Sequence, residues 1–381
     1  MKREVRHIGP QGVGKSIAII GGGVMGAFTA AHLLERGAHV TLYDPNPLGQ
    51  GPGASVDTGR SFRVHYGTDQ GLISMAVRSR ALWSQWSERL GRPLLHPTGK
   101  LLVGESGSEG RDALDSWLTL RKMGLRADRM GRGPIEEEWP GFSADIGTVD
   151  RLGGVLDPEV ILGSLAGWLS QHNLVQKGEV LELEGQRVRC RQGWQAYDQV
   201  VLTSGAWSRR WLSLPMEVTR QELVYFDARS LGETLNRLPV FSHPESGFYA
   251  IPTVKDGRIK VANHHPGPQG HPDGDLRRVS PEFEAAARAF LTRHLPGLAD
   301  AEVVRRYVCF YSGTADRDFI LDRTPEGWVI GAGFSGHGFK FSPLIGRLLA
   351  QLALGEAPEV DLTRFSLHRE ALQGGRVRLA V

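Results

Sequence analysis

The 381-residue chain has little cysteine, little net charge and no long apolar run. Its two cysteines, Cys190 and Cys309, exclude a disulfide framework and are typical of a reducing compartment. The formal net charge of +3 is too small to indicate nucleic acid or a membrane surface as a partner. No run is long enough to span a bilayer, and the basic start Met1–Arg6 is not followed by the apolar core of a signal peptide. We therefore expect a cytoplasmic protein without nucleic-acid or membrane partners.

What the chain does have is an ordinary globular composition, 40% hydrophobic and 23% charged. The length favours two domains, or one large α/β unit with a second lobe. A strand over 16–20, a glycine-rich turn, a helix ending at Gly37 and a strand over 38–44 form a complete βαβ unit. Short β runs between 221 and 261 predict an antiparallel sheet, and a glycine-rich βα unit follows near the C-terminus.

This order predicts an α/β (α+β) fold. A Rossmann-like nucleotide-binding domain would be built from both ends of the chain, with an antiparallel-sheet substrate domain inserted between them. The expected segments are an N-terminal extension at 1–15, the nucleotide-binding domain at 16–95, 145–215 and 318–375, and the substrate domain at 96–144 and 216–317.

Two phosphate-loop signatures lie side by side near the N-terminus. Gly9–Ser16 has the P-loop spacing, but an isoleucine-rich strand follows it where a helix is needed, so we reject an ATP or GTP site. Gly21-x-Gly23-x-x-Gly26 has a strand before it, a helix after it and Asp44 as the acidic residue beyond. There the glycines permit the tight turn, the approach of a pyrophosphate and helix packing, while Asp44 would bind ribose hydroxyls. The motif predicts a dinucleotide and leaves FAD and NAD both open.

A second glycine-rich loop, Gly331–Ser342, connects a strand pattern to a helix pattern. Its glycines would let the backbone approach a ligand. Ser342 is the expected N-cap and Pro343 the first helical residue, so the positive end of the helix points at the same place. Lys340 adds a cation. The loop therefore predicts an anionic or electron-accepting ligand.

For several other residues the sequence pattern allows both a structural and a functional interpretation. Cys309 lies in an alternating strand, where a cysteine is most often a buried small hydrophobe, and Cys190 has the same interpretation. Arg60, Arg63 and His65 follow a long loop and are either solvated or able to bind a carboxylate. Arg258–His264 alternates, so Lys260 and His264 share a face that is either exposed to solvent or lines a pocket.

The C-terminal third carries the most specific pattern. Cys309-Phe-Tyr311, Asp318-Phe-Ile-Leu-Asp322 and Gly333-Phe-Ser-Gly-His-Gly-Phe-Lys-Phe-Ser342 stand in the order and spacing of a known family. On these residues the chain resembles the monomeric sarcosine oxidase and N-methyltryptophan oxidase family of FAD-dependent amine oxidases, within the D-amino-acid-oxidase-like superfamily. The likeness extends from about Ile17 to about Arg369.

The resemblance implies a function. FAD would occupy the dinucleotide site, and the C–N bond of a secondary or cyclic amino acid would be oxidised to an imine while dioxygen is reduced to hydrogen peroxide. The implied partners are the amino acid and dioxygen, and a monomer is compatible with the family. Cys309 matches the cysteine that binds the flavin 8α-methyl group through a thioether, so the FAD is expected to be covalent.

The resemblance also implies roles in the pocket. Arg63 and Lys340 match the two cations that bind the substrate carboxylate, and Tyr249 and His264 match pocket residues. Lys260 matches the lysine that activates dioxygen. The implied catalytic residues are Lys260, Arg60, His264 and Tyr249. The implied cofactor-binding residues are Gly21, Gly23, Val24, Met25, Gly26, Asp44, Cys309, Tyr311, Gly333, Gly336, Gly338 and Lys340, with a second contacting turn near Gly205, and no metal is expected.

The chain departs from the family at several positions. Ser55 and Val56 stand near the place where the family often has two histidines, Asn263 replaces a bulkier residue, and the Ser242–Ser246 loop differs. Residues 1–15 have no counterpart. The competing functions are a flavin dehydrogenase that passes electrons to a protein or quinone, a non-catalytic FAD-binding subunit and a nicotinamide dehydrogenase. Lys260 and the two substrate cations favour the oxidase.

Overall fold

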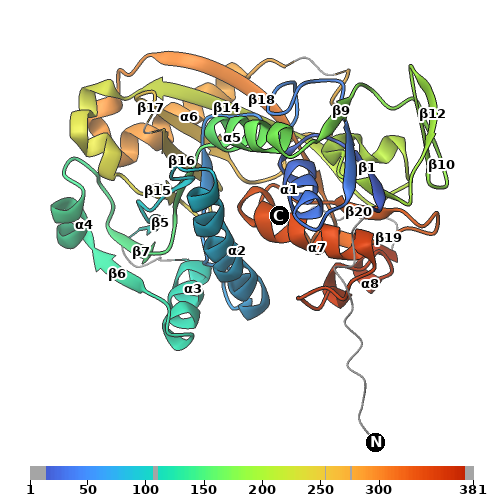
Figure 1. Cartoon of the computed structure of the whole chain (residues 1–381). Helices are drawn as coiled ribbons and strands as arrows, with labels where there is room; N and C mark the ends of the chain where they lie inside the picture. The colour runs from blue at the N-terminus through green and yellow to red at the C-terminus, as the bar shows by residue number, and fades with distance from the viewer. Residues whose placement is uncertain (1–13, 106–109, 254, 275–276, 374–381) are drawn as a thin grey trace, which may run out of the picture.

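Two β-sheets organise the computed structural model, which describes residues 14–105, 110–253, 255–274 and 277–373 (Figure 1). The strands of a six-stranded sheet lie on the right in Figure 1, and those of an eight-stranded sheet lie on the left and along the top. The predicted extension at 1–15, apart from its last two residues, lies outside the described residues. A mixed α/β fold with a parallel and a largely antiparallel sheet confirms the predicted fold class.

The six-stranded sheet has the order β19-β20-β13-β1-β2-β9 and is parallel except for the edge strand β19. Its strands are β1 Ser16–Ile20, β2 His39–Tyr43, β9 Val175–Lys177, β13 Gln199–Leu202, β19 Ile320–Arg323 and β20 Val329–Ala332. Residues 17–20 of the central strand β1 are buried, as expected of a strand covered on both faces. Ile17 and Ile19 pack with the helices, whereas Ala18 and Ile20 pack on the opposite side with Val188.

Four long helices cover the first of these faces: α1 Val24–Leu34, α2 Gln70–Arg89, α5 Pro158–Gln171 and α7 Ser342–Leu354. Asp69 caps α2 by accepting the Leu72 N–H at 2.9 Å, and Asp157 caps α5 in the same way. Helices α1 and α7 lie side by side, and a Cβ on Gly346 would be 2.5 Å from the Phe28 Cβ. The two helices that follow the glycine-rich segments thus pack directly on one another.

The eight-stranded sheet has the order β18-β14-β17-β16-β15-β5-β7-β6, and only the β15–β5 pair is parallel. Its strands are β5 Lys100–Gly104, β6 Ala127–Gly131, β7 Ile146–Asp150, β14 Glu217–Asp227, β15 Val240–Ser242, β16 Phe248–Thr253, β17 Arg258–Asn263 and β18 Val303–Gly313. Strand β7 belongs to this sheet although it falls within the segment 145–215 assigned to the nucleotide-binding part. The division into two domains stays a prediction.

The remaining elements are short or peripheral. They comprise the small sheets β3 Arg60–Phe62, β8 Gly154–Leu156 and β4 Leu95–His96, and β10 Glu182–Glu184, β11 Arg187–Cys190 and β12 Gly193–Ala196; the helices α3 Arg111–Lys122, α4 Arg132–Glu138, α6 Pro281–His294 and α8 Glu370–Gln373; and the 3-10 turns η1 Gly205–Arg210, η2 Arg229–Arg237, η3 Pro296–Leu298, η4 Phe339–Phe341 and η5 Thr363–Phe365. Cys190 is buried beside β13, as the pattern predicted.

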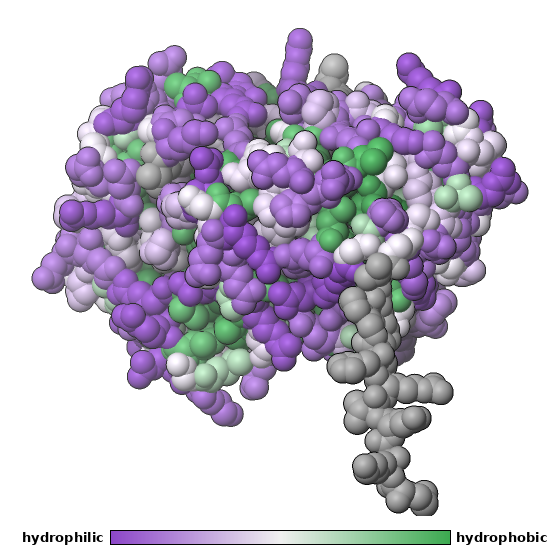
Figure 2. Space-filling model, viewed as in Figure 1, coloured by the Kyte–Doolittle hydropathy of each residue, from purple (hydrophilic) through white to green (hydrophobic). Residues whose placement is uncertain are grey.

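The face in Figure 2 is largely hydrophilic, with an apolar group over α3, where Leu114 and Leu118 are exposed. Within the described ranges, no helix has the length and apolarity to cross a membrane. The same residues contain no group of His, Cys, Asp and Glu side chains able to hold a metal ion.

Candidate active site

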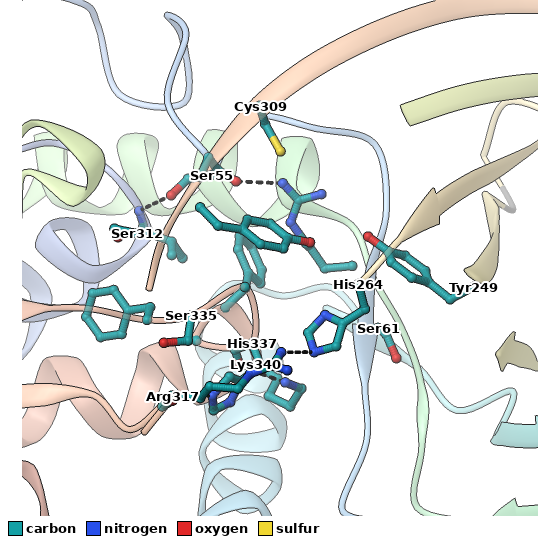
Figure 3. A pocket seen from close by; sticks show the side chains of 18 of the residues that line it. Ser55, Ser61, Tyr249, His264, Cys309, Ser312, Arg317, Ser335, His337 and Lys340 are labelled. Carbon is teal, nitrogen blue, oxygen red and sulfur yellow. Dashed lines mark hydrogen bonds between the residues drawn. The ribbon is translucent and has the colours of Figure 1, made fainter. Parts of the chain in front are cut away.

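A cavity of about 450 Å³ is lined on one side by strands of the eight-stranded sheet and on the other by loops that follow strands of the six-stranded sheet (Figure 3). It brings together most of the residues singled out in the sequence. Those that line it are Gly21, Gly23, Val24, Met25, Asp44, Ser55, Arg60, Arg63, His65, Gly205, Tyr249, Lys260, His264, Cys309, Tyr311, Gly336, Gly338 and Lys340. Gly26 and Gly333 lie outside the lining and shape the turns behind it.

The first glycine turn fits a dinucleotide. Gly21 has a φ of +109°, and a Cβ there would be 2.6 Å from the Thr203 carbonyl oxygen. A Cβ on Gly26 would be 2.0 Å from the Gly21 carbonyl oxygen. Gly23 is the N-cap of α1 and has no side chain to cap it, and the positive end of the helix faces the cavity that Val24 and Met25 line. Ser55 Oγ accepts the next N–H, from Val24, at 3.0 Å.

Asp44 completes this turn from the end of β2. One carboxylate oxygen accepts the Gly22 N–H and the other accepts the Asn46 N–H, both at 2.8 Å. These two bonds orient the carboxylate beside the cavity that it lines. The chemistry of this donor set is that of a ribose-binding carboxylate next to a phosphate-binding turn.

The glycines of Gly331–Ser342 serve internal packing as well as approach to the cavity. A Cβ on Gly336, where φ is +75°, would be 2.3 Å from the Tyr311 ring. A Cβ on Gly338 would be 2.6 Å from the Phe334 Cβ, and one on Gly333 would be 2.7 Å from Thr314. The prediction that these glycines let a ligand approach the backbone is therefore incomplete. Side chains of Tyr311, Thr314 and Phe334 occupy the space that a Cβ on each glycine would need.

The start of α7 also differs from the prediction. The N-cap is Phe341, after the 3-10 turn η4, and Ser342 is the first helical residue. Within the described part of the chain, the buried Ser342 hydroxyl has no hydrogen-bond partner. Pro343 still lies in the first turn, where its missing N–H is tolerated.

A buried charge cluster surrounds Asp57, which sequence reasoning missed. Lys260, in β17, donates from Nζ to Asp57 Oδ2 and to the Gly59 carbonyl, each at 2.6 Å. Arg60 and the Tyr225 hydroxyl also contact the Asp57 carboxylate. Asp57 and Lys260 are each 1% exposed. The side chain of Lys260 is therefore held in place by a carboxylate that belongs to the loop before β3.

Two effects act on the Lys260 ammonium in opposite directions. Burial, followed by the charge of Arg60, lowers the pKa of Lys260 well below its ordinary value. The Asp57 carboxylate, 2.6 Å away, favours the charged form. Asp57 is thus the group on which a positive charge at Lys260 depends.

We expect Asp57→Asn to destabilise the protein by about 3–5 kcal/mol, because it leaves the buried Lys260 and the partly buried Arg60 without their carboxylate. Urea unfolding of the holoenzyme, followed by tryptophan fluorescence, measures this loss. Asp128→Asn is the matched control, since Asp128 pairs with Arg151 at 2.6 Å but is 49% exposed, and it should cost less than about 1 kcal/mol. Equal losses for the two variants would show that the buried cluster adds no stability.

A second group of cations lies across the cavity. Lys340 donates from Nζ to the His337 carbonyl at 2.6 Å and to the Tyr66 hydroxyl at 3.0 Å. The Arg63 guanidinium stacks over the Tyr66 ring, with its Cζ 4.0 Å from the ring centre. Burial, then the charges of Arg63 and Lys100, lowers the pKa of Lys340. Tyr66 and His337 were missed in the sequence although they neighbour predicted residues.

His264 reaches the same end of the cavity from the end of β17 (Figure 3). Arg317 Nη2 lies 2.7 Å from His264 Nε2. A guanidinium can only donate, so His264 accepts at Nε2 and is neutral with its proton on Nδ1. Burial, then the charge of Arg317, lowers the pKa of His264 well below its ordinary value. His264 therefore offers a ring N–H rather than a positive charge.

Cys309 and Tyr311 alternate along β18, so both side chains face the cavity, and Tyr249 faces it from β16. Cys309 is 2% exposed, and its sulfur points inward in Figure 3. Burial raises the pKa of the Cys309 thiol, whereas Arg60 and Lys260 oppose that rise. Burial likewise raises the pKa of Tyr249 and of Tyr311.

Known proteins match this chain over most of its length. The family described as "DAO: FAD dependent oxidoreductase" matches residues 16–352. Monomeric sarcosine oxidase of Bacillus sp. (strain B-0618) is 28% identical, covering 94% of this chain and 96% of its own. N-methyl-L-tryptophan oxidase of Salmonella newport (strain SL254) is 25% identical, covering 93% and 98%. The crystal structure of glycine oxidase from Geobacillus kaustophilus is similar with a TM-score of 0.81 and 25% identity, covering 93% and 99%.

Proposed function

Because the chain belongs to the family of FAD-dependent oxidoreductases and is a sarcosine oxidase-like enzyme acting on CH–NH bonds, we propose that it oxidises a secondary or cyclic amino acid to an imine and reduces dioxygen to hydrogen peroxide. One observation carries this proposal: Arg63 and Lys340 line the cavity beside the dinucleotide turn, and Lys260, which Asp57 holds from behind, lines it separately. The relatives named sarcosine oxidase, N-methyl-L-tryptophan oxidase and glycine oxidase support amino acids as the substrate class.

The residues of the first glycine turn would hold FAD. The α1 N-terminus and Gly23 would face the pyrophosphate, and Asp44 would bind the ribose. Bound FAD would supply the acceptor for two electrons from the C–N bond. The protein contributes the position of the amine, the exclusion of water and the electric field around it.

Arg63 and Lys340 would bind the substrate carboxylate and fix the amine carbon at reacting distance. Lys340 is held by Tyr66 and His337, so little freedom is lost when the carboxylate binds. The surrounding positive charge and the low exposure would lower the pKa of the substrate amine. The neutral amine is the form that can release its electrons, and this pocket favours it.

Lys260 would provide positive charge where dioxygen gains electrons. It lies on the wall formed by β17, and Cys309 lines the same cavity. Arg60 lies beside it through their shared partner, Asp57. This arrangement favours dioxygen over a protein or quinone acceptor.

Peroxide formation under air tests the oxidase assignment. With a secondary amino acid that reduces the flavin, we expect one hydrogen peroxide for each imine formed, and no requirement for an added acceptor dye. If turnover in air is negligible and a dye or quinone restores it, the enzyme is a dehydrogenase. In that case the enzyme still oxidises an amine, and the proposal that Lys260 activates dioxygen is wrong.

We further propose that Cys309 binds the flavin covalently through a thioether. Its sulfur faces the cavity and is shielded from solvent, which supports this position for the bond. Acid-precipitated protein should stay yellow, and Cys309→Ser should release all its flavin into the supernatant. Cys190→Ser is the matched control, since Cys190 is buried away from the cavity. Colourless wild-type precipitate would refute the attachment.

A further inference from the structure

The cavity carries more positive charge than one carboxylate needs. Four cations line its substrate end, and they are Arg63, Lys100, Arg317 and Lys340. Among the described residues the acidic side chains in the lining are Asp44, at the dinucleotide turn, and Asp112, which is exposed at the start of α3. Neither is part of this group. Arg63 and Lys340 suffice for the substrate carboxylate of the proposed function. Lys100 and Arg317 therefore have no assigned anion.

Lys100 is the more unusual of the two. It begins β5 and is 3% exposed. Its register partners are Val240 on β15 and Asp150 on β7. Leu102, two residues further along β5, also lines the cavity, so β5 presents this face to it. A buried lysine in such a strand is costly unless an anion meets it.

The anion near Lys100 receives its hydrogen bonds from other groups. Asp150 contributes a charge that acts on Lys100, but its Oδ2 accepts the Val64 N–H at 2.6 Å and its Oδ1 accepts the Leu152 N–H at 2.9 Å. Within the described ranges, no atom accepts a hydrogen bond from the Lys100 ammonium. Lys100 is therefore a nearly fully buried donor at the cavity wall without an acceptor.

Arg317 makes two hydrogen bonds in the same region. Its φ is +63°, a backbone conformation that an arginine adopts at some cost. Its carbonyl accepts a hydrogen bond from His337 Nε2 at 3.0 Å, and its guanidinium donates to His264. Figure 3 shows its side chain beside those of His264 and Lys340. The loop thus positions a second guanidinium at the cavity instead of releasing it to solvent.

The charge of Arg63 acts on each of the other three cations. Burial first, and the charge of Arg63 second, lowers the pKa of Lys100, of Lys340 and of Arg317. Arg63 is therefore central to the group, within electrostatic reach of the other three. A ligand with one negative charge leaves repulsion among them, and a ligand with two relieves it.

We propose that the substrate is an amino dicarboxylic acid with a secondary or cyclic amine, whose second carboxylate is bound by Lys100 and Arg317. The inference rests on the proposed function and names the substrate class of that same site. The first carboxylate stays with Arg63 and Lys340. Lys100 and Arg317 are specificity residues that select acidic over neutral side chains or N-substituents.

Titration calorimetry on the holoenzyme with unreactive acids of equal length tests the second site. We expect succinate to bind at least about tenfold more tightly than butyrate, and malonate more tightly than propionate. Lys100→Met or Arg317→Met should reduce the succinate-to-butyrate preference to about threefold or less. Lys255→Met, at a lysine that is 64% exposed, should keep the wild-type preference. Equal binding of succinate and butyrate by the wild-type protein would overturn the proposal, whether or not a variant folds.

Anaerobic flavin reduction separates this proposal from the proposed function. N-methylaspartate should reduce the flavin at lower concentration than N-methyl-2-aminobutyrate, which has the same carbon chain with one carboxylate. If the two are equally effective, the second carboxylate site is refuted and the amine oxidase survives. If no amino acid of either kind reduces the flavin, the proposed function itself fails.

Discussion

Replacing Lys260 by methionine should slow reoxidation of the reduced holoenzyme by dioxygen by on the order of 10²- to 10³-fold, because a preorganised charge is removed from the place where negative charge develops. Reduction by the substrate should slow far less, since the substrate cations Arg63 and Lys340 stay in place. Stopped-flow absorbance of the two half-reactions, measured separately, gives both rates. Equal slowing of both would remove the role assigned to Lys260.

The partner of Lys260 complicates this variant and also provides its control. Lys260→Met leaves the Asp57 carboxylate with Arg60, Tyr225 and the Thr58 N–H as its partners. A slow reaction could then come from the added negative field instead of the lost positive charge. The double variant Lys260→Met, Asp57→Asn removes both charges. We expect reoxidation to stay slow in it, and a return to the wild-type rate would assign the effect to Asp57. Lys255→Met, on the surface, should leave both rates unchanged.

Replacing Arg63 by methionine should raise the dissociation constant of amino-acid substrates about 30- to 700-fold, which corresponds to about 2–4 kcal/mol. The guanidinium is the central cation of the substrate end, and its loss leaves the carboxylate with Lys340 as its assigned partner. The dependence of the anaerobic reduction rate on substrate concentration gives the constant. The limiting rate should fall as well, because a loosely held amine spends less time at reacting distance.

The outcome for Arg63 can be separated from a general loss of structure. Arg78→Met is the matched control, since Arg78 is an exposed arginine of α2 that bonds the Glu359 carbonyl. Binding of substrates and release of flavin should both match wild type in this control. An Arg63→Met protein that keeps its flavin and binds substrate as tightly as wild type would contradict the carboxylate site.

Local patterns in the sequence predicted the parts of the fold that depend on neighbouring residues. The βαβ opening was correct because its strand, Gly21 turn and helix are continuous in the chain. Alternation correctly placed Lys260 and His264 on one face of β17. Whether this face of β17 lines the cavity or meets solvent depends on how β17 pairs with β14 and β16. Alternation of residue types along β17 does not decide between the two.

The residues that were missed act across long sequence separations. Asp57 is 203 residues from Lys260, and no local pattern marks such a pair. Lys100 resembles any lysine at the start of a strand until β15, from the second half of the chain, is placed beside it. The sequence marks the glycines of Gly331–Ser342, but the packing of Gly336 against Tyr311 depends on the position of β18. The one local signal for Asp57 is its position three residues before Arg60, a residue of opposite charge.

Anaerobic titration of the holoenzyme with secondary and cyclic amino acids, with and without a second carboxylate, tests the central claim most directly. We predict that at least one of them bleaches the flavin absorbance completely. Readmitted air should then restore the colour and release one hydrogen peroxide per flavin. Flavin that stays oxidised with every compound in the panel would contradict the assignment of this cavity to amino-acid oxidation.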